Sequence, residues 1–251
     1  MQYTVKKQGE FEYIDEGSGE VLIMLHGLFG ALSNWTDVIE HFSPKYRVLI
    51  PMMPIYTMPL KQADLNGLTD FIESFIAFQN LKEFSLIGNS LGGHIGLIFT
   101  LRHPHSVKRL VLTGSSGLFE HGMGNSYPRR SSYEFVRERV AYTFYDSTIA
   151  TKELVDEVFE VTNDNSSCLR MISIARSAQR HNMAKDIHVI KVPTLLVWGL
   201  NDTITPPVVA HEFNNLLSNS TLKFVDKCCH VPMMEHPKVF NKYFEDFLNN
   251  S

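Results

Sequence analysis

The ten residues from Phe84 to Gly93 constrain the fold of this chain more than any other stretch. An apolar run, Phe84 to Ile87, leads into the pattern Gly-x-Ser-x-Gly, and apolar residues at helical spacing follow from Ile95. This order predicts a strand, a tight turn that carries the serine, and a helix. Side chains at either glycine would collide with the neighbouring strand or helix, and the serine itself is held in a strained conformation.

Ser90, the central residue of this turn, is a candidate nucleophile. The turn exposes its hydroxyl beside the N-terminus of the following helix, where unpaired backbone N–H groups and the helix dipole favour negative charge. An oxyanion that forms next to Ser90 would therefore be stabilised. The alternative interpretation is a glycine-rich turn whose serine has no chemical role, because short motifs also occur by chance.

Strands and helices are expected to alternate on both sides of this turn. Continuous apolar runs indicate strands buried on both faces. The predicted strands cover residues 11–14, 21–25, 47–50, 84–87, 107–112, 192–198 and 221–225, the first of them as a short antiparallel edge strand. The predicted helices cover residues 33–42 with Ser33 as N-cap, 64–80, the segment after Ser90, a segment after Pro207, and 237–248. The alternation predicts an α/β fold with a mainly parallel sheet and right-handed crossovers.

The alternation stops between residues 118 and 187. A loop is expected at 122–125, and three helical patterns follow at 131–144, 151–162 and 167–182, with Ser132 and Thr151 as candidate N-caps of the first two. No strand candidate lies between these patterns. We therefore expect an inserted α-helical cap, or lid, at 118–187 over the carboxyl edge of the sheet, on a core formed by residues 1–117 and 188–251.

The composition narrows the class of protein. With 251 residues, 44% of them hydrophobic, the chain can form one large α/β domain. A net charge of −4 argues against a nucleic-acid partner. The N-terminus has no signal-peptide pattern and no later run reaches about 18 apolar residues, so we expect a cytoplasmic protein without membrane association.

The three cysteines, Cys168, Cys228 and Cys229, match neither a disulfide framework nor a zinc site. Adjacent cysteines rarely bridge each other, so small buried thiols are expected, with a nucleophilic cysteine as the lesser alternative. We expect no metal and no cofactor.

The segment from Pro51 to Leu60 contains too many prolines for regular structure. It is also rich in methionine and more apolar than a solvated loop requires. Two interpretations stay open, a wall of a substrate pocket and a cover over the core.

Ser90, Asp202 and His230 stand in the order nucleophile, acid, histidine, each just after a predicted strand. Loops that follow parallel strands gather at one edge of the sheet, so these three side chains can meet there. A serine hydroxyl is a poor nucleophile until a histidine takes its proton, and an acidic acceptor must orient the imidazole. Taken singly, Asp202 could be a turn residue and His230 a loop histidine, but the order and strand context together predict a catalytic triad.

The chain resembles the α/β-hydrolase superfamily over nearly its whole length. The matching motifs are His26-Gly27-Leu28-Phe29-Gly30, Gly88-Asn89-Ser90-Leu91-Gly92, Trp198-Gly199-Leu200-Asn201-Asp202 and Cys229-His230-Val231-Pro232. This resemblance implies a cofactor-free serine hydrolase in which the backbone N–H groups of Leu28 and Leu91 form the oxyanion hole. His26 is expected to hold the oxyanion loop by hydrogen bonding, and His94, one helical turn after Ser90, to be packed.

Two branches of the superfamily share features with this chain. Asn89, Gly93 and the segment Glu235-His236-Pro237 are similar to the meta-cleavage-product hydrolases, which split carbon-carbon bonds. The loop from His26 to Gly30 is poorer in glycine than theirs and looks more like that of small-ester carboxylesterases. Val231 stands where the carbon-carbon hydrolases commonly carry tryptophan.

The substrate pocket is expected to include Phe29, Asn89 and Val231, which adjoin the proposed catalytic residues. Arg176 and Arg180 continue a helical stripe with Leu169 and Ile172 in the cap, so either arginine could bind a substrate carboxylate. The alternative is that both arginines extend from the helix edge into water.

Together these features predict a serine hydrolase that forms an acyl-enzyme on small or medium carboxylic esters. Carbon-carbon hydrolysis of the meta-cleavage-product type is the second hypothesis, and a ligand receptor built on the same fold is the third. The expected partner is a small-molecule ester or related carbonyl compound, bound by a monomer or homodimer. The cap at 118–187 would set specificity and contribute little to the chemistry.

Overall fold

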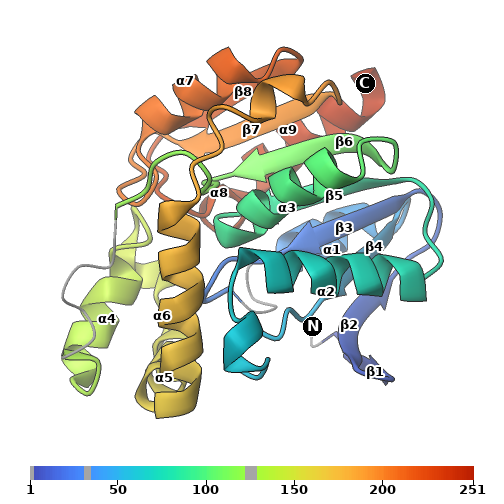
Figure 1. The fold of residues 1–251 in the computed structure, drawn as a ribbon. Coiled ribbons are helices and arrows are strands. Elements are labelled where there is room, and N and C mark those ends of the chain that lie inside the picture. The colour runs from blue at the N-terminus through green and yellow to red at the C-terminus, as the bar shows by residue number, and fades with distance from the viewer. Residues whose placement is uncertain (1–2, 31–34, 122–128) are drawn as a thin grey trace.

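The computed structural model describes residues 3–30, 35–121 and 129–251. Within these ranges the chain forms an eight-stranded sheet in the order β1-β2-β4-β3-β5-β6-β7-β8 (Figure 1). The strands are β1 Lys6–Gln8, β2 Phe11–Glu16, β3 Val21–Leu25, β4 Arg47–Pro51, β5 Phe84–Asn89, β6 Val107–Thr113, β7 Thr194–Gly199 and β8 Ser220–Val225. The β1·β2 and β2·β4 pairs are antiparallel and all other pairs are parallel. The expected α/β fold with a mainly parallel sheet is therefore confirmed.

Helices cover both faces of the sheet, which is why its central strands are continuous apolar runs. Every residue of β5 and β7 is buried. One face is covered by α2 Leu65–Phe78, α3 Leu91–Arg102 and α7 Pro207–Leu216, and the other by α1 Thr36–Phe42 and α9 Pro237–Asn250. The two hydrophobic cores thus lie on opposite sides of the sheet, and the loops at its edge remain available for a site.

The helical insertion follows β6 and precedes β7. Its described elements are α4 Tyr133–Ala141, α5 Lys152–Asn163, α6 Asn165–Arg180 and the 3-10 turns η4 Ser147–Ile149 and η5 Ile187–Val189. Figure 1 shows α4, α5 and α6 together at the end of the sheet toward which the parallel strands point. Ser132 and Thr151 cap α4 and α5 through their hydroxyls, as predicted. The loop expected at 122–125 lies outside the described residues.

The N-terminal edge of the sheet differs from the prediction. The segment at 11–14 belongs to β2, and β1 pairs outside it, so β2 is not an edge strand. All three residues of β1 are exposed and polar, and therefore no apolar alternation marks this strand in the sequence. Gly9, with φ of +61°, makes the turn between the two strands, a conformation that glycine adopts without strain.

Two helices also differ from the prediction. The helix expected from Ser33 is seen as α1 from Thr36, and Ser33 itself lies outside the described residues. A short helix that was not predicted, α8 Pro232–Glu235, follows His230 directly. It bends the chain back just after the histidine loop.

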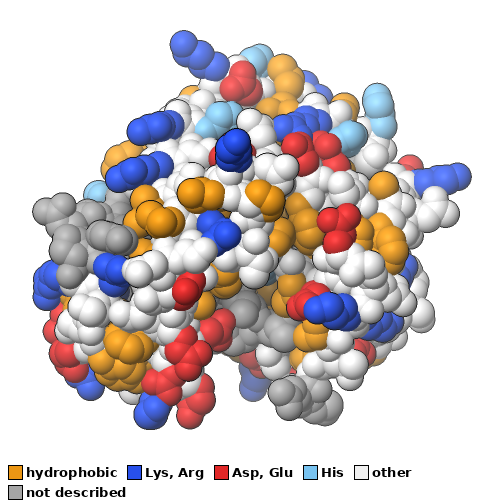
Figure 2. Space-filling model, turned by 60° about the horizontal axis from the view of Figure 1, so that its bottom comes forward, with side chains coloured by type: hydrophobic (Ala, Val, Ile, Leu, Met, Phe, Trp, Pro, Cys, Tyr) orange, Lys and Arg blue, Asp and Glu red, His pale blue; other side chains and the backbone are white. Residues whose placement is uncertain are grey.

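The surface carries charges of both signs, and the cysteines are buried. Across the described residues, no helix combines the length and the apolar character that crossing a membrane requires. Figure 2 shows Lys and Arg side chains intermixed with Asp and Glu over one face of the molecule. Cys168, Cys228 and Cys229 are free and buried, as expected, and burial raises the pKa of each thiol.

Candidate active site

Ser90 lies at the tip of the turn between β5 and α3 in a strained backbone conformation. Its φ is +54° and its ψ is −118°, a region that residues with a side chain rarely adopt. A Cβ at Gly88 would lie 2.5 Å from the backbone of Gly92, and a Cβ at Gly92 would lie 2.3 Å from the carbonyl oxygen of Leu25. Both glycines are therefore required for the turn to pack against the sheet. Ser90 occupies the N-cap position of α3 without using its hydroxyl as a cap, which leaves Oγ available.

Asp202 and His230 are hydrogen-bonded to each other in the loops after β7 and β8. His230 Nδ1 lies 2.9 Å from Asp202 Oδ2, and both residues are buried. The other carboxylate oxygen accepts the N–H groups of Ile204 and Thr205, and the Thr205 hydroxyl donates to Oδ2. These bonds hold the carboxylate in place, so the ring donates through Nδ1 and presents Nε2 as an acceptor.

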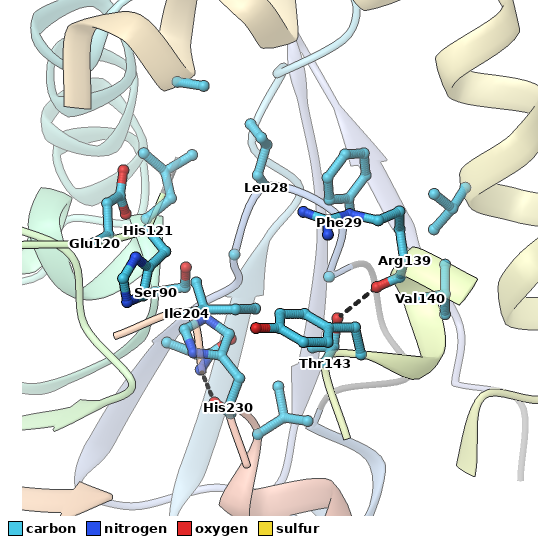
Figure 3. A pocket seen from close by; sticks show the side chains of 18 of the residues that line it. Leu28, Phe29, Ser90, Glu120, His121, Arg139, Val140, Thr143, Ile204 and His230 are labelled. Atoms are coloured by element: carbon cyan, nitrogen blue, oxygen red, sulfur yellow. Dashed lines mark hydrogen bonds between the residues drawn. The ribbon is translucent and has the colours of Figure 1, made fainter. Parts of the chain in front are cut away.

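Ser90 and His230 line one cavity of about 470 Å³ at the carboxyl edge of the sheet. Figure 3 shows both side chains reaching into it. The insertion supplies much of the opposite wall. Its apolar lining residues are Phe135, Val136, Val140, Phe144, Leu154, Val158, Ala175 and Ala178. The structure therefore places a hydroxyl, an imidazole and an apolar chamber next to one another.

Leu28 and Leu91, whose backbone N–H groups were expected to form the oxyanion hole, both line this cavity. Leu91 is the first residue of α3, so its N–H has no acceptor within the helix. Leu28 follows β3, and its carbonyl oxygen accepts a hydrogen bond of 2.8 Å from the Tyr56 hydroxyl. Both leucines line the cavity beside Ser90. That the two N–H groups stabilise an oxyanion in acyl transfer stays a prediction.

The segment at 51–60 supports the Leu28 loop from behind. His26 Nδ1 donates to the carbonyl of Gly27 over 2.8 Å, and His26 Nε2 accepts the N–H of Met53 over 3.3 Å. Burial lowers the pKa of His26, which keeps its ring neutral for these two roles. Among the described residues that line the cavity, none comes from 51–60. Of its two interpretations the core cover is the observed one, because Met53, Ile55 and Met58 are buried in the core.

The electrostatics of the site favour a basic histidine. Burial alone lowers the pKa of His230, but the carboxylates of Asp202, Glu120 and Glu235 outweigh it, and the pKa is raised above its ordinary value. Burial also raises the pKa of the Glu120 carboxyl, which the positive charge on His230 partly offsets. The imidazolium form of His230 is therefore stabilised by three acidic neighbours.

Three of the five predicted pocket residues lie at the cavity. Phe29, Asn89 and Val231 line the cavity, and the Asn89 amide donates to the carbonyl oxygens of Thr113 and His230. His94 is packed beneath the turn and contacts His181 through a nitrogen-nitrogen distance of 2.9 Å.

Arg176 and Arg180 were candidate pocket residues, with extension into water as the alternative, and the structure agrees with the alternative. Both are exposed, and neither is among the residues that line the cavity. The core-facing stripe of α6 contains Cys168, Met171, Ile174 and Ala178. The stripe that begins at Leu169, which is 49% exposed, therefore points outward and takes both arginines with it.

Other charged side chains were missed. Glu120, Arg130 and Arg139 line the cavity. On α4, the apolar residues Val136 and Val140 are four positions apart and mark an inner face that Arg139 adjoins, so this spacing was a usable signal. Glu120 stands alone in a loop, where no periodicity could have indicated it. Among the described residues there is no cluster of His, Cys, Asp or Glu side chains that could hold a metal ion.

The insertion also holds the histidine loop. The carbonyl oxygen of Thr143 accepts the N–H of His230 over 3.2 Å. Glu235 bridges the two segments, because its carboxylate accepts the N–H of Cys229 over 2.7 Å and the N–H of Tyr145 over 2.6 Å. These bonds explain why α4 ends at Ala141 rather than at 144, since the next backbone groups serve the site.

Comparison with known proteins decides the family. The family model of the alpha/beta hydrolase fold matches residues 20–144 and 145–237. The chain belongs to the α/β-hydrolase family. A solved structure of an alpha/beta hydrolase enzyme from the metagenome of sediments of the Mar Chica lagoon, Morocco, is 39% identical with a TM-score of 0.81, over 98% of both chains.

Curated relatives of this α/β hydrolase have different activities. A 2-hydroxy-6-oxo-2,4-heptadienoate hydrolase of Pseudomonas putida is 27% identical over 93% of this chain and 91% of its own. A monoacylglycerol lipase of Mus musculus is 24% identical over 90% of this chain and 75% of its own. The resemblance found in the sequence is confirmed, and the protein is a serine hydrolase of the α/β fold.

Proposed function

We propose that this hydrolase cleaves esters with an apolar acyl group of small or medium size. Ser90 attacks the carbonyl carbon while His230 takes its proton, and Asp202 stabilises the imidazolium that forms. The oxyanion is held by the N–H groups of Leu28 and Leu91. His230 then gives the proton to the leaving alcohol, and water releases the acyl group by the same sequence of steps.

The apolar chamber beside Ser90 carries this proposal. Its walls come from α4, α5 and the segment between them, with Val136, Val140, Leu154 and Val158 as aliphatic lining. Burying a hydrocarbon chain there is favourable by about 0.8 kcal/mol for each methylene group. The monoacylglycerol lipase among the relatives provides a precedent for an acyl substrate. We propose residues 118–187 as the cap that encloses this chamber.

Carbon-carbon hydrolysis is the second candidate, and Arg139 is the observation in its favour. The Pseudomonas putida relative acts on a dienoate, which carries a carboxylate. Arg139 lines the cavity, and its guanidinium lies 5.3 Å from the ring centroid of Tyr142. A guanidinium in this position could bind a substrate carboxylate, the role expected earlier of Arg176 and Arg180.

One comparison of kcat/KM separates the two reactions. The substrates are p-nitrophenyl butyrate and 2-hydroxy-6-oxo-2,4-heptadienoate, and the variants are Ser90→Ala and Arg139→Ala. Arg137→Ala is the matched control, because Arg137 lies on the same helix but pairs with Glu134 at the surface. We expect the ester to be preferred, Ser90→Ala to lose about 10⁴-fold in kcat, and both arginine variants to retain ester turnover.

Two results would contradict the ester proposal. The first is a dienoate preference of a hundredfold or more that collapses in Arg139→Ala but not in Arg137→Ala. The second is a Ser90→Ala variant that is folded and retains most of its activity. Labelling by a fluorophosphonate probe at a residue other than Ser90 would also refute the assigned nucleophile.

A further inference from the structure

Glu120 lies across Ser90 from the part of the chamber wall that α4 forms. Figure 3 shows Glu120 and His121 on one side of the serine and Phe29, Arg139 and Val140 on the other. The backbone of His121 fixes this segment, since its N–H donates to the carbonyl of Ile204 over 2.7 Å. An ester whose acyl chain fills the chamber must therefore direct its alcohol toward Glu120.

The Glu120 carboxylate acts on His230 through its charge and not through a hydrogen bond. Within the described ranges no side chain or backbone group forms a hydrogen bond or ion pair with it, although it is partly buried and interacts electrostatically with His230. Its oxygens are not among the fully buried side-chain atoms, so a molecule in the cavity can reach them. The charge is thus directed into the cavity beside the reacting atoms.

A second hollow begins where Glu120 stands. It is lined by Gly117, Leu118, Phe119, Glu120, Ala178 and Gln179, and three of these residues also line the main cavity. Phe119 is 51% exposed there. The ring of Phe119 also contacts that of His121, with 5.1 Å between the centroids. A carboxylate and an aromatic ring that line one hollow can together bind an ammonium group, through charge attraction and through the face of the ring.

We propose that Glu120 and Phe119 form a leaving-group subsite that selects esters of alcohols carrying an ammonium group. The inference rests on the proposed ester hydrolysis and adds the class of alcohol. The other titratable or charged side chains that line this cavity are His230 and His121 near Glu120, and Arg130 and Arg139 on the α4 side. The two arginines disfavour a cation in the acyl chamber, so a cationic substrate is oriented with its ammonium group toward Glu120.

Choline butyrate and 3,3-dimethylbutyl butyrate provide a matched pair of substrates. The two esters have the same shape, and only the first carries a positive charge. At pH 8 we expect kcat/KM of the parent to favour the choline ester by about tenfold. The ratio should fall to about one in Glu120→Gln and by about threefold in Phe119→Ala, which changes an exposed residue and leaves folding intact. Glu157→Gln, a carboxylate of α5 that lines neither hollow, should keep the parent ratio.

If the protein cleaves neither butyrate ester, a binding measurement still tests the ammonium subsite. Choline and its uncharged analogue 3,3-dimethylbutanol should both protect Ser90 from fluorophosphonate labelling. In the parent, the concentration needed for half protection should be about tenfold lower for choline. In Glu120→Gln, the two alcohols should protect at equal concentrations. A parent that cleaves neither butyrate refutes the ester proposal, and the protection assay then still decides the ammonium site. Equal kcat/KM for both esters in the parent, or a choline preference that survives in Glu120→Gln, overturns the inference about Glu120 and leaves ester hydrolysis in place.

Discussion

At the scale of single residues, the site combines a strained serine with a histidine surrounded by carboxylates. The positive φ of Ser90 persists because Gly88 and Gly92 let α3 pack directly on the sheet. A conformation of this kind costs about 1–3 kcal/mol, which the surrounding packing must supply. His230 is buried, yet its pKa is raised because Asp202, Glu120 and Glu235 stabilise the positive charge. The base is therefore tuned by residues from two loops and from the short helix α8.

The pH dependence of kcat/KM follows from the raised pKa of His230. Only the neutral imidazole accepts the serine proton, so activity should rise with pH through an apparent pKa above the ordinary value of about 6.5. In Glu120→Gln one of the carboxylates is lost, and the titration should move to lower pH. A pH-rate profile on p-nitrophenyl butyrate measures both values, with Glu157→Gln as control. A profile that is flat from pH 5 to 8, or one that Glu120→Gln shifts upward, would argue against this assignment of the base.

At the scale of elements, the insertion is attached to the catalytic loops through backbone hydrogen bonds. Glu235 on α8 accepts from Cys229 and from Tyr145, so one carboxylate connects the histidine loop to the segment after α4. Thr143 adds a bond to the N–H of His230 itself. We therefore expect the insertion to position the loop that carries the proposed base, in addition to setting specificity.

Glu235→Gln tests this connection. The amide can accept only one of the two N–H groups, and its NH₂ group then faces the other donor. We expect the free energy of unfolding to fall by about 2 kcal/mol, and kcat to fall more than KM changes. Urea denaturation and ester kinetics measure the two effects. Glu245→Gln on α9 is the control, since that carboxylate forms exposed ion pairs far from the site. Wild-type kcat together with reduced stability would show that Glu235 stabilises the fold without positioning His230.

At the scale of the whole molecule, the sheet and the insertion divide the proposed reaction between them. Loops after β3, β5, β7 and β8 present the reacting groups, while α4 and α5 provide the apolar chamber. Loops at the carboxyl edge of a parallel sheet converge in this way regardless of the helices that cover them. Substrate preference can therefore change through the insertion while the chemistry is kept.

Cavity-enlarging substitutions in the insertion should change the preferred acyl length. Val140→Ala and Leu154→Ala remove methyl groups from the chamber wall, so kcat/KM should shift toward longer p-nitrophenyl esters, each added methylene being worth about 1–3 kcal/mol. Val155→Ala is the matched control, because Val155 is buried in the same helix but lies outside the cavity lining. It should lose stability without a change in preference. A uniform loss of activity on every ester, in folded protein, would place a catalytic group in the insertion.

The sequence by itself determined the parts of this protein that depend on local patterns. The Gly-x-Ser-x-Gly turn, the buried strands and the caps Ser132 and Thr151 were predicted because glycine tolerance, apolar runs and hydroxyl caps act between residues close in the chain. The triad Ser90, Asp202 and His230 could also be predicted, since each residue follows a predicted strand and the three stand in the expected order. The strand β1 was missed because its polar residues pair only through the backbone.

Only the tertiary structure decided which side chains face the cavity. Arg176 and Arg180 share a stripe that looked suitable, yet the way α6 packs turns this stripe toward solvent and leaves Ala175 and Gln179 at the cavity. Glu120, isolated in a loop, lines the same cavity as Ser90, and the N–H of the neighbouring His121 is bonded to the carbonyl of Ile204 in the loop that carries Asp202. The rotation of a helix about its axis and the path of a loop are set by contacts between distant segments, and a pattern along the chain does not contain them.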